Sequence, residues 1–218
     1  EALTCVFNHT LENDPLNQLI LTTNMTPNNI FLLQALRNYC HQISQGGTSK
    51  THINDAIIRY PAFAEHLTQR LAIQFKPKLS KSQRQKQLNA LSSKIKRTLK
   101  SVSSISDDQL LRKLDSIVHA CLRCNLFIKQ ADEPLSFKFD CDKIMGMPTP
   151  VPFKEIFVYD YHLEGVHIRF GSVARGGLRW SNRHNDYRTE VLGLAKTQQT
   201  KNAVIIPVGS KGGFVIKH

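Results

Sequence analysis

The spacing at which apolar side chains recur changes once along this chain, near residue 132. Before that point apolar residues return every three or four positions, which is typical of amphipathic helices. From Leu135 to Asp140 apolar and polar residues alternate, as they do in a half-buried strand. We therefore predict an α/β fold in which a helical region over residues 1–132 precedes a mixed region over residues 133–218.

The helical region is expected to contain at least four helices. Thr26 followed by Pro27 gives a hydroxyl N-cap and a proline at the first helical position, which favours a helix start. Residues 106–109, with the sequence SDDQ, form a capping-box pattern in front of a further helix. Apolar stripes at helical spacing predict helices over residues 26–40, 53–59, 62–75, 88–102 and 106–122.

The mixed region is expected to supply strands and one helix. Alternating patterns predict strands over residues 135–140, 153–159 and 166–170, and a helix follows over residues 189–199. Residues 203–208 are a short apolar run, which indicates a strand buried inside a sheet.

Positive charge is concentrated in one stretch of the chain. The formal net charge is +12, and residues 76–100 hold nine basic residues and no acidic one. Such a run could bind the phosphates of nucleic acid. The chain has no aromatic residue between Phe75 and Phe127 that could stack on bases. A solvated helix face or an interface patch is therefore favoured, and a basic module that binds nucleic acid or an acidic partner is the alternative.

Cysteine usage and hydropathy predict a cytoplasmic protein. The five cysteines are odd in number and irregularly spaced, which favours reduced thiols over a disulfide framework. Cys121 and Cys124 have CxxC spacing, but no second ligand pair accompanies them. We interpret them as a buried pair of small side chains and expect no metal site. No apolar run approaches the ~20 residues that cross a bilayer, so no membrane association is expected.

Three cations stand beside glycine pairs or at the end of a predicted strand. Glycine lets backbone N–H groups and a substrate approach closely, so this pattern on separate loops predicts a pocket for a small dianion. The P-loop pattern GxxxxGK[ST] is not met, and two glycine turns with solvated cations remain the alternative. The residues concerned are Arg175, Lys201 and Lys211, with Gly176, Gly177, Gly212 and Gly213.

The stretch over residues 162–215, which contains ARGGLRW, TKN and SKGGF, closely resembles the large-subunit NAD-specific glutamate dehydrogenases. The resemblance extends more weakly to the residues before 132. It implies that residues 133–218 are the first part of an α/β substrate-binding domain. It also implies oxidative deamination of L-glutamate to 2-oxoglutarate and ammonia, with the hydride passed to NAD.

The resemblance also assigns roles to the cations. Lys211 stands where the superfamily has its catalytic lysine, and Lys201 matches the lysine that holds the substrate α-carboxylate. Arg175 stands where small-subunit relatives have a lysine for the distal carboxylate, which an arginine can bind through two parallel hydrogen bonds. The four glycines would shape the pocket through the backbone.

Other parts of the family pattern are missing from the 218 residues. The catalytic aspartate and the NAD-binding domain of the family follow the SKGG motif, and no GxGxxG sequence occurs here. We therefore expect a fragment of a longer homo-oligomeric enzyme that is inactive in isolation and binds NAD through a downstream domain. A dehydrogenase for an apolar amino acid is a rival, although it would be expected to have an apolar residue in place of Arg175.

Overall fold

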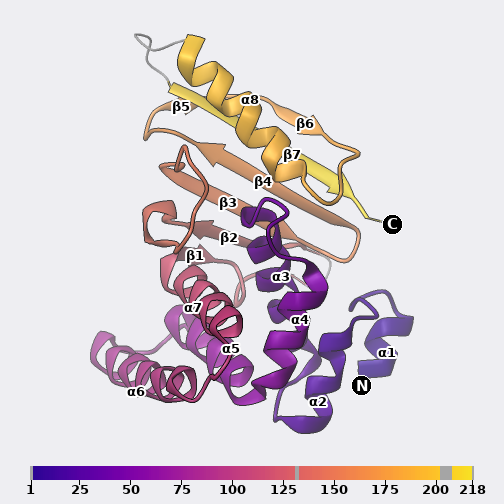
Figure 1. The fold of residues 1–218 in the computed structure, drawn as a ribbon, viewed down its shortest axis with the longest axis vertical. Helices are drawn as coiled ribbons and strands as arrows, with labels where there is room; N and C mark the ends of the chain where they lie inside the picture. Colours follow the sequence, from indigo (N-terminus) through magenta and orange to yellow (C-terminus); the bar gives the residue numbers. More distant parts are fainter. Residues whose placement is uncertain (1, 131–132, 202–207, 218) are drawn as a thin grey trace.

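The computed structural model describes residues 2–130, 133–201 and 208–217, with the side chains of 199–201 excepted. Figure 1 shows helices α1–α7 gathered at one end of a sheet, and α8 lying over the strands at the other end. The helices are α1 (Ala2–Phe7), α2 (Leu19–Thr22), α3 (Pro27–Ile43), α4 (Lys50–Arg59), α5 (Pro61–Phe75), α6 (Lys81–Lys100), α7 (Ile105–Ala120) and α8 (Tyr187–Lys201). The strands are β1 (Cys121–Cys124), β2 (Leu135–Phe139), β3 (Lys154–Tyr159), β4 (Leu163–Arg169), β5 (Ala174–Arg175), β6 (Leu178–Trp180) and β7 (Val208–Ile216).

Local capping chemistry sets where the helices begin. The Thr26 hydroxyl accepts from the backbone N–H of Asn29, and the Asn29 side chain accepts from the backbone N–H of Thr26, so the predicted start of α3 is confirmed. The predicted cap of α7 was wrong by two residues, because Ser104 and not Ser106 accepts from the N–H of Asp107. Capping at Ser104 buries the Asp107 carboxylate, where it pairs with an arginine of α4.

The end of α7 also differs from the prediction. We expected the helix to continue to Leu122, but it ends at Ala120 and the chain continues as β1. Cys121 lies opposite Phe139 in an antiparallel pair with β2. This pairing joins residues far apart in sequence, so it overrides a local pattern that suited a helix.

Within the described residues, the sheet has seven strands in the order β1-β2-β3-β4-β7-β5, and β6 also pairs with β7. Strands β1, β2, β3, β4 and β7 are antiparallel to their neighbours in that order, while β5 and β6 run parallel to β7. Every second residue of β2 and β3 is buried, and this face meets the helices. The α/β fold class predicted from the sequence is confirmed.

One hydrophobic core joins the helices to the sheet. Tyr39 of α3 stacks on Phe139 of β2 with a ring separation of 4.4 Å, and it also contacts Phe157 of β3. The boundary predicted near residue 132 falls on residues 131–132, which lie outside the described residues. The division into two domains at that point stays a prediction.

Candidate active site

Lys211 lies within β7, where the sheet supports it from both sides. On one side it is opposite Ile168 of β4, and on the other the carbonyl of Gly177 accepts from the N–H of Gly212 at 3.0 Å. We expected this cation to be on a loop, and Arg175 likewise, but Lys211 is in β7 and Arg175 is in β5. Strand pairing satisfies the backbone groups that the glycines leave accessible to a neighbouring strand.

The first glycine pair lets the segment after β5 approach β7. A β-carbon on Gly176 would lie 1.5 Å from the backbone oxygen of Ser210, so no side chain fits there. A β-carbon on Gly177 would lie 3.6 Å from Nζ of Lys211, which is an ordinary contact distance. The lysine ammonium group therefore lies directly beside the backbone of Gly177.

The second glycine pair lets other elements pack on β7. A β-carbon on Gly213 would lie 2.3 Å from Cγ2 of Val191, so its absence allows α8 to lie close to the strand. A β-carbon on Gly212 would lie 2.8 Å from Cδ1 of Leu178, which is a mobile end of an exposed side chain. The predicted glycines thus have a packing role at this place.

The cations near Lys211 are not equivalent. Arg175 is exposed and lies opposite Gly209, two positions before Lys211 in β7, which is roughly 7 Å along a strand. Neither Arg175 nor Lys211 forms an ion pair with a described residue. Arg179, in contrast, forms an ion pair through Nε with Glu190 of α8 at 2.8 Å and is therefore neutralised.

Glu190 is a site residue that the sequence did not reveal. Its Oε1 pairs with Arg179, and its Oε2 accepts from the hydroxyl of Ser181 at 2.6 Å. Both partners follow the glycine pair, so α8 holds the segment that faces Lys211. The only available signal was an acidic residue in the first turn of the predicted helix.

Two predictions fall wholly or partly on residues that are not described. Lys201 is the last residue of α8, and its side chain is outside the described set, so its position relative to Lys211 stays a prediction. The strand expected over residues 203–208 is outside it too, apart from Val208, which begins β7.

The basic run predicted to be a solvated face lies mainly on α6. Leu91, Ile95 and Leu99 are buried, while nearly all the cations between residues 76 and 100 are exposed. Cys121 is buried and Cys124 half-buried, and burial raises the pKa of the Cys124 thiol to about 11. A thiol with a raised pKa is a poor nucleophile, which favours the structural interpretation of the pair.

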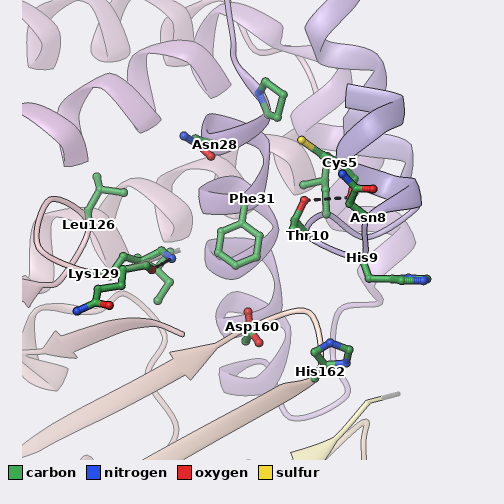
Figure 2. Close-up of a pocket in the computed structure, with 14 residues that line it drawn as sticks. Cys5, Asn8, His9, Thr10, Asn28, Phe31, Leu126, Lys129, Asp160 and His162 are labelled. Atoms are coloured by element: carbon green, nitrogen blue, oxygen red, sulfur yellow. Dashed lines mark hydrogen bonds between the residues drawn. The ribbon is translucent and has the colours of Figure 1, made fainter. Parts of the chain in front are cut away.

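A cavity of about 690 Å³ lies away from these cations, between α1, the start of α3 and the β1–β2 connection. In Figure 2, Phe31 lies between the Cys5–Thr10 side and the Leu126–Lys129 side of this space. The Lys129 ammonium donates to the carbonyls of Gln130 and Glu133, so its charge is held within its own loop. None of the predicted site residues lines this cavity.

The described residues contain no candidate for a membrane-spanning helix or a metal centre. No helix in this part of the chain is both long and apolar enough to cross a bilayer. In the same part, no three His, Cys, Asp or Glu side chains converge as they would around a metal ion.

Comparisons with known proteins agree with the resemblance. Residues 94–218 match the family described as "Bacterial NAD-glutamate dehydrogenase, catalytic domain", and residues 11–77 match "Glutamate dehydrogenase, helical motif 3". NAD-specific glutamate dehydrogenases from Halomonas elongata and Mycobacterium tuberculosis are 40% and 38% identical over 221 and 222 residues. Each alignment covers 100% of this chain but 14% of the relative. The Pseudomonas aeruginosa enzyme is 42% identical, over 94% of this chain and 13% of its own length.

Proposed function

Because this chain belongs to the bacterial NAD-glutamate dehydrogenase family, we propose that it forms the substrate-binding side of an enzyme that deaminates L-glutamate oxidatively to 2-oxoglutarate and ammonia. One observation carries the proposal. The Lys211 ammonium lies beside the Gly177 backbone, and Arg175 is two strand positions away without an acidic partner among the described residues. With no acidic partner among the described residues, Arg175 is available for a substrate carboxylate beside Lys211.

The proposed roles of these side chains are those that the resemblance to the family implies. Arg175 binds the distal carboxylate of glutamate through its guanidinium fork, and Lys201 binds the α-carboxylate. Lys211 acts at the α-carbon, where its ammonium form stabilises negative charge on a developing oxygen and its amine form accepts a proton from water. The Gly177 backbone leaves room for the substrate beside the lysine.

The residues present do not fit NAD. The sequence contains no GxGxxG, and the described part of the chain has no glycine-rich turn between a strand and a following helix that could hold a pyrophosphate. We therefore propose that other residues of the enzyme bind the cofactor, and we assign no hydride-transfer step to this chain. The 218 residues alone are expected not to sustain NADH formation.

The proposal includes assembly and compartment. We propose that the enzyme is cytoplasmic, since the five cysteines of this chain are free and three of them are buried. Its proposed assembly as a homo-oligomer rests on the resemblance to the family alone. The names of the relatives give no support to a basic module for nucleic acid or an acidic partner, so we do not propose that function for residues 76–100.

Lys211 provides the test. In an enzyme of full family length that carries this chain, called the full-length enzyme below, Lys211→Ala is expected to lower kcat by about 10²-fold or more, because proton transfer is lost. Lys100→Ala, which removes an exposed lysine at the end of α6, is the matched control and should leave kcat unchanged. Steady-state NADH formation measures both. A Lys211→Ala enzyme with kcat within a few-fold of the parent would refute the assignment.

A further inference from the structure

A buried ion pair ties α8 to the sheet. Arg188, in the first turn of α8, donates from Nε to Oε1 of Glu155 at 2.8 Å and from Nη2 to Oε2 at 2.7 Å. Both side chains have an exposed fraction of 0%. Burial alone would lower the pKa of Arg188, but the Glu155 carboxylate raises it above the ordinary value, so the arginine stays charged.

A third residue joins this pair to the helical region. Gln42 of α3 accepts from the backbone N–H of Arg188 at 3.4 Å through Oε1, and its Nε2 donates to the carbonyl of His184 at 3.2 Å. The start of α8 is therefore fixed by β3 on one side and by α3 on another. Figure 1 shows α8 lying over the strands close to the end of α3.

The same turn of α8 touches the candidate site at two points. Glu190, two residues after Arg188, holds Arg179 beyond the glycine pair. Val191 packs on Gly213, two residues after Lys211. A shift at the start of α8 would therefore move both segments that position Lys211.

A buried ion pair contributes little to the free energy of unfolding. A protein with apolar residues of similar volume in place of such a pair is often at least as stable. A bidentate pair instead fixes distance and orientation through two parallel hydrogen bonds. Geometry is thus the property that Glu155 and Arg188 provide and that apolar packing would not.

We propose that Arg188, held by Glu155 and Gln42, is a positioning residue that sets the location of Lys211 through the first turn of α8. This inference rests on the proposed function only for its effect on turnover. The location of the lysine can be measured independently of any activity.

The test compares two pairs of substitutions. Glu155→Met with Arg188→Met replaces the pair by apolar side chains, so neither charge is left buried alone. The matched control is Arg70→Met with Asp115→Leu, which removes the 2.7 Å ion pair between α5 and α7. Three quantities are measured on the full-length enzyme: the Tm, the rate at which Lys211 is methylated by formaldehyde and cyanoborohydride, and kcat and KM for glutamate.

The apolar double variant is expected to keep a Tm within a few degrees of the parent. Its Lys211 methylation rate should change by about threefold or more, and kcat should fall by about tenfold or more. The control pair of substitutions should change neither the Lys211 methylation rate nor kcat. A methylation rate and a kcat within about twofold of the parent would overturn the proposal.

A second variant serves if the double variant does not fold. Arg188→Lys keeps the charge but loses the bidentate geometry, and the same shifts in methylation and kcat are expected. Unchanged values in this variant would also overturn the proposal. If the parent enzyme forms no NADH from glutamate, the proposed function fails, and the methylation rate alone still decides whether Arg188 positions Lys211.

Discussion

Gly176 and Gly177 are adjacent, yet they lack side chains for different reasons. A β-carbon at Gly176 would meet a backbone oxygen at 1.5 Å, and a strand backbone cannot move away without breaking its pairing. A β-carbon at Gly177 would meet the end of the flexible Lys211 side chain at 3.6 Å. Neither glycine has a positive φ, so at Gly176 it is close approach that requires glycine, whereas at Gly177 a β-carbon fits at an ordinary contact distance.

This difference predicts opposite results for two similar substitutions. Gly176→Ala should lower the free energy of unfolding by about 2 kcal/mol or more, because β5 must separate from β7. Gly177→Ala should leave stability unchanged or raise it by about 0.4–1 kcal/mol, while its methyl group crowds Lys211 and lowers kcat. Thermal unfolding and NADH formation in the full-length enzyme measure the two effects. Equal losses of stability would contradict the geometry described for this segment.

Glu164 of β4 is a buried carboxyl whose Oε2 has no hydrogen-bond partner among the described residues. Burial raises its pKa, and the nearby Lys50 and Lys217 only partly counter this effect. The Glu12 carboxylate also raises the pKa of Glu164, whereas the Arg37 guanidinium lowers it. A raised pKa means that the folded state holds the proton more tightly than the unfolded state.

The ordinary pKa of glutamate, 4.5, applies to the unfolded state. As the pH rises from 4.5 through the raised pKa of the folded state, Glu164 therefore lowers the free energy of unfolding progressively. Glu164→Gln removes this titration. The variant should match the parent in Tm below pH 4.5 and exceed it near neutral pH. Thermal unfolding of both proteins across this range measures the difference. A difference in Tm that does not change with pH would contradict the assigned direction.

At the scale of elements, the sequence predicted what depends on neighbouring residues. The start of α3 at Pro27 follows from its cap, and the break between α4 and α5 follows from Pro61. Prediction from the sequence failed where pairing with residues distant in sequence determines the secondary structure. β1 exists because it pairs with β2, and the SKGG segment is a strand because β4 and β6 pair with it, although glycine is a poor strand former.

The candidate site shows the same limit. Charge and glycine spacing were sufficient to single out Arg175 and Lys211, because those features are visible in the sequence itself. Glu190 and Arg188 were missed, since their roles arise only when α8 packs on β7 and β4 and their side chains meet Arg179 of β6 and Glu155 of β3. A single acidic residue or arginine in a helix carries no sequence signal of the partner it will meet.

At the scale of the molecule, the helical region is continuous with the sheet that contains the candidate site. Aromatic side chains of α3 pack on β2 and β3, and the hydroxyl of Tyr159 donates to Gln34 at 3.3 Å. Lys217, directly after β7, pairs with Glu12. The strand that carries Lys211 is therefore held by residues from both regions of the chain.

Arg175 is proposed to bind the distal carboxylate of a substrate that reacts beside Lys211. The most direct measurement is kcat/KM for L-glutamate and for L-leucine in the full-length enzyme and in its Arg175→Met variant. Because the Arg175 guanidinium can form two hydrogen bonds with the glutamate side chain and none with that of leucine, the parent should prefer glutamate by about 10²-fold or more, and the variant should lose most of that preference. Equal turnover of leucine by the parent, or a preference that Arg175→Met leaves unchanged, would contradict the claim.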